Sequence, residues 1–401
     1  MKILYITTIG IGMVFYKSLI GELVAEGNEV DVATNETTSA VPAFYRELGC
    51  RIYHIDTSRS PFSLGNVRAI RQIRELVQEN GYDLVHCHTP LAAASTRFAC
   101  KGLRKQGKVK VLYTAHGFHF YKGAPLKNWL LFYPIEKLCS RYTDVLITIN
   151  QEDYELAKKK MKAKRVEYVP GVGIDVAKFA NMVVDRKQKR AELGVPETAF
   201  MLLSVGELNK NKNHKVVIKA LAQLKDVQCE HCEQSEDSRC AACAPCADVH
   251  YVIAGIGKER NSLLRLAARL GVKLHLLGFR EDIAELDKVA DCYVLPSIRE
   301  GFNVSVMEAM ASGLACVVSD IRGNRELIDE KGGFLCKATS SEAFAEAIRK
   351  VLEKKVQTEK VPVDKMLASG LEEYASYNPK KALAFDKAII NAQMKSIYES
   401  L

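Results

Sequence analysis

Short apolar segments alternate with amphipathic ones along nearly the whole chain, and this alternation constrains the fold more than any other feature. The apolar segments have the length of strands, and the segments between them have helical spacing. Short apolar strands separated by helices belong in parallel sheets with helices on both faces. Strands are expected at residues 2–8, 29–34, 51–56, 83–89, 109–116, 144–150 and 165–170, then at 200–206, 249–255, 273–278, 291–297, 315–320 and 332–336, with helices such as 67–79, 215–224, 259–270 and 341–352 between them.

The pattern occurs twice, which predicts an α/β fold with two doubly wound, Rossmann-like domains. At 401 residues the chain is also too long for one ordinary core. The expected boundary lies in the Gly- and Lys-rich stretch 170–190, between an N-terminal domain of residues 1–178 and a C-terminal domain of residues 179–379. The amphipathic tail, 380–401, is expected to be helical and to cross back to the first domain. A cleft between the two domains is the expected place for a small ligand.

Positive charge is concentrated in the first part of the chain. Residues 1–180 hold 25 Lys and Arg against 17 Asp and Glu, a net charge of +8, while the whole chain has +9. This balance favours an anionic partner, although solvated helix ends would explain it equally well. A membrane surface fits better than nucleic acid, because the chain has no aromatic-basic RNA motif and no DNA-binding motif. No apolar run is long enough to span a membrane and no cleavage site follows the first strand, so a cytoplasmic protein is expected.

Two glutamates, Glu300 and Glu308, flank the point where the strand at 291–297 should give way to a helix. Open α/β sheets bind ligands at such carboxyl ends, and a helix N-terminus there suits a diphosphate. Eight helical residues rise roughly 12 Å, so the two carboxylates can meet opposite ends of an extended ligand such as a nucleotide-sugar. The spacing alone is equally compatible with two unrelated surface glutamates.

A polar loop at residues 206–214 follows the first strand of the second half. Gly206 ends the strand, and Lys210 and Lys212 precede the next helix, well placed to neutralise a diphosphate as point charges. The loop is not a P-loop, because the GxxxxGK[ST] pattern is absent. Read alone, it could also be an ordinary exposed Lys-Asn loop.

Further motifs accompany these two in a fixed order along the chain. They are 114–121 (TAHGFHFY), 133–137 (YPIEK), 144–150, and 169–175 (VPGVGID) with Phe179. With them, the chain resembles the retaining, nucleotide-sugar-dependent glycosyltransferases of family 4, which have the GT-B fold of two Rossmann-like domains facing a cleft. More narrowly, it is similar to bacterial exopolysaccharide and capsule glycosyltransferases. The likeness covers nearly the whole chain.

The resemblance implies roles for individual residues. Glu308 is expected to hold the ribose hydroxyls and Glu300 to contact the donor sugar, while Lys212 occupies the position of the family's phosphate-binding lysine. His116 matches the histidine near the reacting sugar, so His116, Glu300 and Lys212 are the expected catalytic residues. The remaining expected donor contacts are Gly12, Gly206, Lys210, Arg280, Gly301, Phe302, Asn303 and Val304, the last two through backbone amides.

One position departs from the family pattern. Many relatives have an arginine directly after the glycine that corresponds to Gly206, whereas this chain has Glu207. The second phosphate cation must then come from elsewhere, with Lys210 or Arg280 as candidates. Fixed cations and helix N–H groups can stabilise the departing diphosphate without a metal, and no DxD-type cluster is evident. The resemblance implies transfer with retention of configuration and without a required cofactor.

The expected acceptor is a polyprenyl-diphosphate-linked saccharide at the inner membrane surface, and the expected donor is a UDP-sugar, plausibly of an N-acetylhexosamine. UDP comes from the resemblance, because no base-contacting residue is recognisable. The apolar, aromatic stretch 129–134 lies among lysines, which suits docking on the inner leaflet; ordinary helix packing is equally compatible with it. A GT-B epimerase or phosphorylase is the alternative within the enzymes, and a metal-sensing binding protein is the alternative outside them.

Seven of the twelve cysteines are scattered in apolar segments, as expected of small buried side chains in a reducing compartment. The other five cluster in a polar insert, 227–247. Two C-x2-C pairs there have metal-ligand spacing, and a structural zinc is the first interpretation, ahead of an unmetallated, redox-labile loop and an iron–sulfur cluster. The expected ligands are Cys229, Cys232, Cys240 and Cys243, with Cys246 or His231 as alternates.

Overall fold

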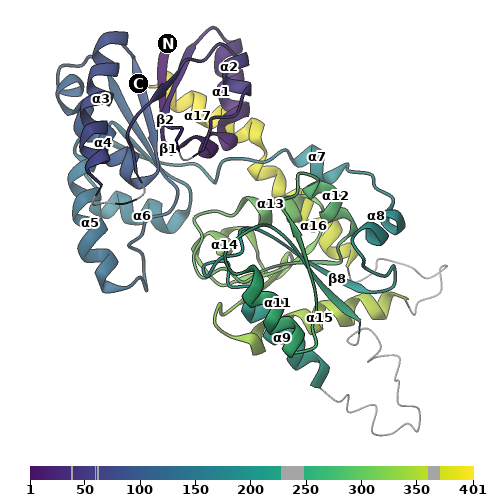
Figure 1. Cartoon of the computed structure of the whole chain (residues 1–401). Coiled ribbons are helices and arrows are strands. Elements are labelled where there is room, and N and C mark those ends of the chain that lie inside the picture. Colours follow the sequence, from purple (N-terminus) through teal and green to yellow (C-terminus); the bar gives the residue numbers. More distant parts are fainter. Residues whose placement is uncertain (38, 59, 61–62, 227–247, 360–370) are drawn as a thin grey trace, which may run out of the picture. The chain divides into compact units, whose positions relative to one another are not determined.

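A computed structural model describes residues 1–37, 39–58, 60, 63–226, 248–359 and 371–401. These residues form two compact units (Figure 1). The first unit comprises Met1–Gly173 together with Lys387–Leu401, and the second comprises Ile174–Asp386. The last helix therefore belongs to the same unit as the first strand.

The first unit is built on a seven-stranded sheet in which neighbouring strands run parallel. Its order, β3-β2-β1-β4-β5-β6-β7, reverses direction between β1 and β4, and doubly wound folds bind ligands at such a switch point. The strands are β1 (Lys2–Ile9), β2 (Glu29–Asn35), β3 (Ile52–His54), β4 (Leu84–His88), β5 (Lys110–Ala115), β6 (Val145–Thr148) and β7 (Arg165–Tyr168). The helices are η1 (Gly10–Tyr16, a 3-10 helix), α1 (Lys17–Ala25), α2 (Phe44–Glu47), α3 (Leu64–Asn80), α4 (Pro90–Lys105), α5 (Leu126–Ser140), α6 (Gln151–Lys160) and α17 (Lys387–Glu399).

The second unit has a six-stranded parallel sheet of order β10-β9-β8-β11-β12-β13, which reverses direction between β8 and β11. The strands are β8 (Phe200–Val205), β9 (Val249–Ala254), β10 (Lys273–Gly278), β11 (Cys292–Leu295), β12 (Ala315–Ser319) and β13 (Gly333–Cys336). The helices are α7 (Val176–Ala180), α8 (Arg186–Glu192), α9 (Lys215–Asp226), α11 (Arg260–Arg269), α12 (Ile283–Val289), α13 (Val304–Ala311), α14 (Arg322–Leu327), α15 (Ser341–Glu359) and α16 (Glu372–Ala382), followed by the 3-10 helix η3 (Leu383–Phe385).

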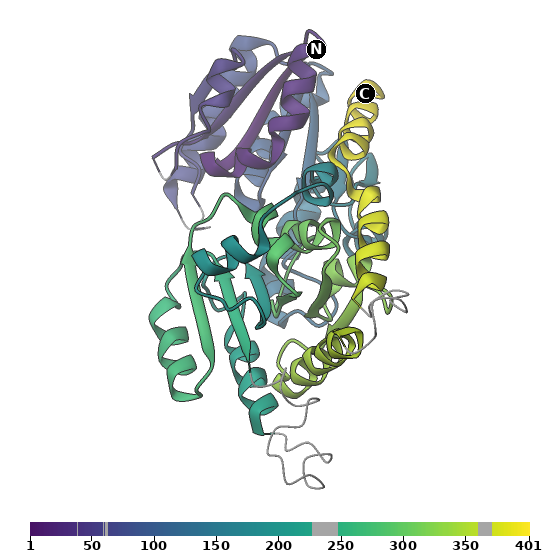
Figure 2. The same ribbon diagram turned by 90° about the vertical axis from the view of Figure 1, so that its right-hand side faces the viewer.

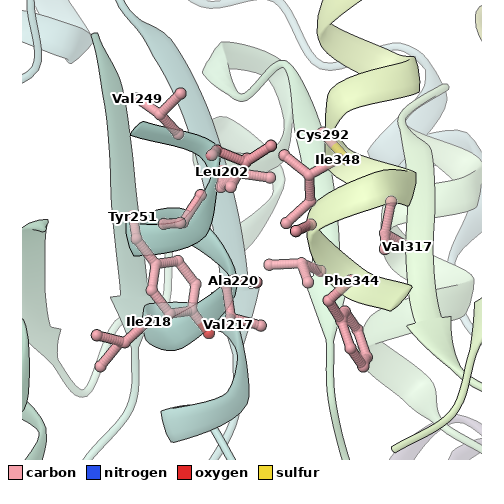
Figure 3. Close-up of a cluster of buried hydrophobic side chains, with 14 of the residues drawn as sticks. Leu202, Val217, Ile218, Ala220, Val249, Tyr251, Cys292, Val317, Phe344 and Ile348 are labelled. Carbon is pink, nitrogen blue, oxygen red and sulfur yellow. The ribbon is translucent and has the colours of Figure 1, made fainter. Parts of the chain in front are cut away.

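The core of the second unit lies between its sheet and helices α9 and α15 (Figure 3). Leu202 and Tyr251 come from the strands, Val217 from α9, and Phe344 and Ile348 from α15, and all five side chains are fully buried. Such apolar burial is the main favourable term in folding. It fixes the strands that carry the loops of the candidate site.

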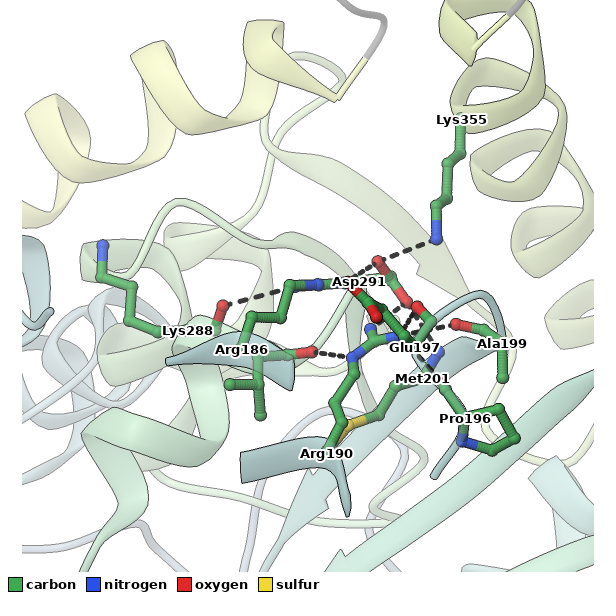
Figure 4. A network of polar contacts seen from close by, with 10 residues as sticks. Arg186, Arg190, Pro196, Glu197, Ala199, Met201, Lys288, Asp291 and Lys355 are labelled. Atoms are coloured by element: carbon green, nitrogen blue, oxygen red, sulfur yellow. Dashed lines mark hydrogen bonds and ion pairs between the residues drawn. The ribbon is translucent and has the colours of Figure 1, made fainter. Parts of the chain in front are cut away.

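A buried ion network joins β8 to β11 at the amino ends of these strands, whereas the candidate site lies at their carboxyl ends (Figure 4). Asp291 accepts from Arg190 and Arg186, at 2.6 Å each, and from the backbone N–H of Met201 at 2.7 Å. Lys355 of α15 lies 3.1 Å from the same carboxylate. Burial opposes the ionisation of Asp291, but Lys355, Arg190 and Arg186 outweigh it and lower its pKa. The network ties α8 and α15 to the sheet.

The last helix, α17 (yellow in Figure 2), packs on the first unit. Its Tyr398 hydroxyl lies 2.5 Å from the hydroxyl of Tyr5 in β1 and 2.6 Å from Nδ1 of His86 in β4. The Asn391 amide donates to Glu22 of α1 at 2.6 Å. Residues from the C-terminal end thus complete the polar interior of the first unit.

The expected α/β fold with two doubly wound sheets is confirmed, and every expected strand is present. One local expectation is wrong. The tail, 380–401, is not a continuous helix, because α16 and η3 end before Asp386 and α17 begins after it. After β1, the stretch from Gly10 forms the 3-10 helix η1. The seven scattered cysteines are buried and unbridged, as expected. None of the helices in the described residues has the length and apolar character to span a bilayer.

Candidate active site

The turn from β11 to α13 brings both predicted glutamates to the carboxyl end of a central strand, beside the switch point of the second sheet. Glu300 precedes the helix and Glu308 lies within it. The helix begins after Asn303, whose side chain accepts a hydrogen bond from the Val306 N–H at 3.3 Å. The first turn of a helix has further N–H groups without helical partners, and these suit an anion.

Lys212 and Glu300 form an ion pair that connects the loop after β8 with the loop after β11. The Lys212 amine lies 2.8 Å from a Glu300 carboxylate oxygen, and the two side chains are only 17% and 16% exposed. Gly206 makes room for this lysine, because a Cβ at Gly206 would lie 3.0 Å from Lys212 Cε. Gly206 also has φ +154, which disfavours other residues. Three of the predicted residues are therefore brought together.

Backbone contacts hold the two loops against each other. The Asn211 side chain donates to the carbonyl of Arg299 at 2.9 Å, and the Ile298 N–H donates to the carbonyl of Asn211 at 2.8 Å. Four hydrogen-bonding groups on two loops are thereby paired, so the Lys212–Glu300 geometry rests on a rigid frame.

Helix α14 closes the other side of the Glu300 turn. A Cβ at Gly323 would lie 2.2 Å from the carbonyl oxygen of Gly301, so the two backbones touch. Arg322 donates through Nε to the carbonyl of Glu300 at 3.3 Å. The Phe302 ring is buried and contacts Phe385, with ring centres 5.3 Å apart. These contacts fix the conformation of the turn.

Glu308 is half-buried within α13. Burial raises its pKa to about 7, against the opposing charge of Lys178 in α7. Asp287 of α12 is fully buried, and neither of its carboxylate oxygens has a hydrogen-bond partner in the described structure. Burial, followed by the charge of Glu308, raises the pKa of Asp287 well above its usual range. Glu308 therefore changes between its neutral and charged forms near physiological pH.

The two candidates for a second phosphate cation differ in their surroundings. Lys210 is exposed at the tip of the loop. Arg280 donates to Asp282 through Nε at 2.7 Å and to Glu192 through Nη2 at 2.8 Å. A phosphate would have to compete with these two carboxylates for Arg280, so Lys210 is the more available cation. Glu207 is exposed beside Gly206.

His116 follows β5 in the first unit, close to the switch point of that sheet. Its Nε2 lies 2.8 Å from the hydroxyl of Tyr16 and 3.3 Å from Nδ1 of His88 at the end of β4. The Tyr16 hydroxyl also lies 3.1 Å from His88 Nδ1. Burial lowers the pKa of His116 to about 4. His116 is therefore a neutral hydrogen-bonding group at physiological pH.

A small cavity of about 30 Å³ lies beside this histidine within the first unit. Apolar side chains such as Leu19, Ile149 and Met394 line most of it, together with His88 and His116. His88 Nε2 is buried and has no hydrogen-bond partner among the described residues. An unpaired buried nitrogen is costly unless a ligand or water meets it. The cavity thus offers a polar contact inside an apolar wall.

Gly12 lies in the middle of η1 after β1, where a Cβ would meet nothing within 4 Å. Its neighbour Gly10 is the glycine that packing requires, because a Cβ there would lie 2.4 Å from the carbonyl oxygen of Ser39. Gly12 thus leaves open space at the carboxyl edge of the first sheet. A close approach by a ligand backbone is compatible with that space.

Some residues of these two clusters were not anticipated from the sequence. His86 and His88 alternate along one strand and so share a face, which is a signal that the sequence contains. Tyr16, Arg322 and Asp287 carry no local motif, and tertiary packing alone places them next to His116, Glu300 and Glu308.

The predicted cysteine metal site, 227–247, lies outside the described residues and stays a prediction. Among the described residues, no group of three or more His, Cys, Asp or Glu side chains is arranged to hold a metal ion.

Comparison with known proteins agrees with the two-unit fold. Residues 10–171 match the model of the glycosyl transferase 4-like domain, and residues 185–364 match that of glycosyl transferases group 1. The crystal structure of Anabaena HepE in complex with UDP and glucose superposes with a TM-score of 0.74 at 21% identity, covering 100% of both chains. The molecule is thus a GT-B-type α/β protein, as predicted.

Relatives identify the family. The putative glycosyltransferase EpsD of Bacillus subtilis is 38% identical over 379 residues, 93% of this chain and 90% of that protein. The UDP-Gal:alpha-D-GlcNAc-diphosphoundecaprenol alpha-1,3-galactosyltransferase of Escherichia coli is 28% identical over 319 residues, 78% of this chain and 77% of that protein. The chain belongs to glycosyltransferase family 4 and is a transferase of the GT-B type, related to enzymes of exopolysaccharide and lipid-linked saccharide synthesis.

Proposed function

We propose that the protein transfers a sugar, with an N-acetylhexosamine as first candidate, from a UDP-sugar to a polyprenyl-diphosphate-linked saccharide, with retention of configuration. The observation that supports this most directly is the Lys212–Glu300 pair beside the N-terminus of α13, with Glu308 about one turn into the same helix. The Lys212 amine and the first N–H groups of α13 suit a diphosphate, and the Glu308 carboxylate farther along the helix suits the ribose that follows it.

In this proposal the donor lies along α13. Glu308 accepts hydrogen bonds from the ribose hydroxyls, and Lys212 contacts the diphosphate. The N–H groups at Asn303 and Val304 meet the phosphate and sugar oxygens, where a helix N-terminus favours negative charge. Glu300 contacts the donor sugar, and Lys210 supplies the second cation. HepE, solved with UDP and glucose, shares this fold.

The reaction breaks the bond between the anomeric carbon and the phosphate oxygen and forms a bond from that carbon to an acceptor hydroxyl oxygen. The hydroxyl proton passes to the departing phosphate, on the face from which the phosphate leaves. Lys212 and the α13 N–H groups stabilise the developing negative charge, which is the role that fixed dipoles and cations perform in such sites. Neutral His116 donates or accepts a hydrogen bond at the sugar. No metal ion is required for this chemistry.

The acceptor part of the proposal rests on the cavity of the first unit and on the relatives. The cavity beside His116 combines apolar walls with the unpaired His88 nitrogen, and at about 30 Å³ it has room for a small group of the acceptor but not for a whole sugar ring. The Escherichia coli relative is named for a diphosphoundecaprenol-linked acceptor. We place the enzyme in the cytoplasm, peripheral to the inner leaflet where such an acceptor is anchored.

A panel of UDP-sugars with a polyprenyl-diphosphate-sugar acceptor, followed by mass spectrometry, tests the proposal. We expect one donor to give an acceptor product larger by one sugar, with unchanged turnover in EDTA. Glu308→Ala should lose most donor use, while Lys219→Ala, an exposed position on α9, should not. Release of UDP without a lengthened acceptor, or loss of turnover in EDTA with recovery in magnesium, would contradict the proposal.

A further inference from the structure

Helix α5 of the first unit has an apolar outer face. Its residues Leu126 and Leu130 are 73% and 71% exposed, and Leu131, Ile135 and Leu138 are 40–44% exposed. Large apolar side chains exposed singly are common, but a contiguous set on one helix marks an interaction surface. We define the outer face of α5 by these five side chains.

The inner face of the same helix is firmly packed. The rings of Trp129, Phe132 and Tyr133 contact the core of the unit, and the Trp129 ring nitrogen donates to the carbonyl of Tyr121 at 3.3 Å. The aromatic residues of the 129–134 stretch therefore point inward, contrary to a membrane-facing aromatic patch. The leucines between them point outward.

A buried ion pair fixes the rotation of α5 about its own axis. Arg97 of α4 donates to both carboxylate oxygens of Glu136, at 2.9 and 3.2 Å, and both side chains are buried. Arg97 also lies over the ring of Tyr113, 4.2 Å from its centre. Rotation of the helix to hide its leucines would break this pair at a cost of several kcal/mol, so the outer face stays exposed.

The charged side chains on the outward half of α5 are all positive, and one carboxylate from α6, that of Glu152, accepts from the Lys122 N–H at 3.2 Å. Lys127 and Lys137 lie on the outward half of α5, and the exposed Lys122 precedes the helix. The Lys137 amine lies over the ring of Tyr133, 5.4 Å from its centre. Glu136 is the only acidic residue in the helix, and Arg97 holds it inside. Leucines between lysines, without an outward carboxylate, are the pattern of a helix that lies in an anionic membrane interface.

We propose that the outer face of α5 docks on the surface of an anionic lipid bilayer, with its leucines among the acyl chains and Lys122, Lys127 and Lys137 at the headgroups. This inference rests on the proposed function, because a lipid-linked acceptor is reached at such a surface. It adds the element and the side chains that make the contact. An apolar face could also bind a second copy of the chain, but the like-charged lysines beside it disfavour that pairing.

Co-sedimentation with vesicles tests the docking surface. The wild-type protein should bind phosphatidylglycerol-containing vesicles at low salt and bind pure phosphatidylcholine vesicles much more weakly. Leu130→Gln with Leu131→Gln should lower binding by roughly tenfold or more, since each leucine buries apolar area in the interface. Lys127→Glu with Lys137→Glu should lower binding by at least about fivefold per lysine.

Matched controls in the second unit separate docking from general surface effects. Val183→Gln with Leu383→Gln changes two exposed apolar residues, and Lys219→Glu with Lys258→Glu changes two exposed lysines. Both pairs should bind vesicles as the wild type does. Equal binding by the α5 variants and the wild type, or no binding of the wild type to anionic vesicles, overturns the proposal. A dimer that depends on Leu130 and Leu131 and occurs without vesicle binding overturns it too.

Activity distinguishes this inference from the function on which it rests. With a short-chain, water-soluble acceptor, the Leu130→Gln, Leu131→Gln variant should transfer sugar at the wild-type rate, and with the acceptor embedded in vesicles it should transfer much more slowly. Transfer to the soluble acceptor without vesicle binding would reject docking and leave the function intact. Vesicle binding without transfer to either acceptor would reject the proposed function and leave the docking surface intact.

Discussion

The side-chain amine of Lys212 lies 2.8 Å from the carboxylate of Glu300, although the two residues are 88 positions apart in the sequence. Each comes from the loop after a central strand, and Gly206 leaves the space that the lysine fills. The ion pair holds the charged Lys212 amine beside α13, and Glu300 keeps this partly buried charge paired. A diphosphate can then share this cation with Glu300.

Lys212→Ala should lower kcat/KM for the UDP-sugar by about 10²–10³, because it removes one fixed charge from the developing diphosphate anion. Steady-state kinetics with the lipid-linked acceptor measure this change. Lys219→Ala, on the adjoining helix α9, is the matched control and should have no effect. Near-normal kinetics of the Lys212 variant would show that this lysine does not contact the donor.

Affinity for the UDP-sugar should rise as the pH increases from about 6 to about 8. Burial raises the pKa of Glu308 to about 7, so Glu308 is largely neutral below that pH, and only its ionised form accepts hydrogen bonds from both ribose hydroxyls. Below pH 7 the gain should approach about tenfold per pH unit. Calorimetric titration measures the affinity, and Glu308→Gln should give a flat profile. The same slope in both proteins would assign the titration to another group.

Glu308 also links stability to pH with a known sign. Its folded pKa lies above the usual value, so the folded state holds more protons between about pH 4.5 and about 7, and stability falls as the pH rises through this window. Glu308→Gln should therefore be more stable than the wild type at pH 8, and the difference should shrink toward pH 5. Thermal unfolding at both pH values measures it; a difference independent of pH would contradict the shifted carboxyl.

Tyr16→Phe should lower kcat by about tenfold and leave the donor KM nearly unchanged. The Tyr16 hydroxyl lies 2.8 Å from His116 Nε2 and 3.1 Å from His88 Nδ1, so it sets which nitrogen of each neutral ring carries the proton. Loss of one such hydrogen bond is worth about one kcal/mol or slightly more. Nitrogen NMR shifts of His116 report the tautomer. Tyr53→Phe, a tyrosine that hydrogen-bonds Asn80, serves as control and should change neither quantity.

Asp291→Ala should destabilise the protein by about 3–5 kcal/mol, because it leaves the fully buried Arg190 without its carboxylate. Urea unfolding followed by circular dichroism measures the free energy. Asp320→Ala removes an exposed ion pair with Arg325 and should cost less than about 1 kcal/mol. A loss at Asp291 as small as that control would mean that the network in Figure 4 contributes little to stability.

The fold was predictable because its strands are apolar on both faces and therefore stand out as short uniform runs. The Lys212–Glu300 contact was not, since a sequence shows which loops follow strands but not which side chains meet. The prediction of one aromatic, apolar patch at 129–134 was wrong. Residues that are neighbours in the sequence lie on different faces of a helix, so the aromatic side chains of α5 point inward and its leucines point outward. The break at Asp386 carries no strong local signal. It arises where the Ile174 N–H donates to the carbonyl of Phe385 at 3.0 Å.

The hydrogen bond between Tyr5 and Tyr398 joins residues that a ribosome adds 393 positions apart. The strands of the first unit can pair while translation continues, but Nδ1 of His86 lacks its partner Tyr398 until the last helix has been made. The second unit has all of its sequence before that moment. Nascent chains arrested before α17 should therefore expose an unfinished amino-terminal half to proteases and chaperones, although that half is the first to leave the ribosome.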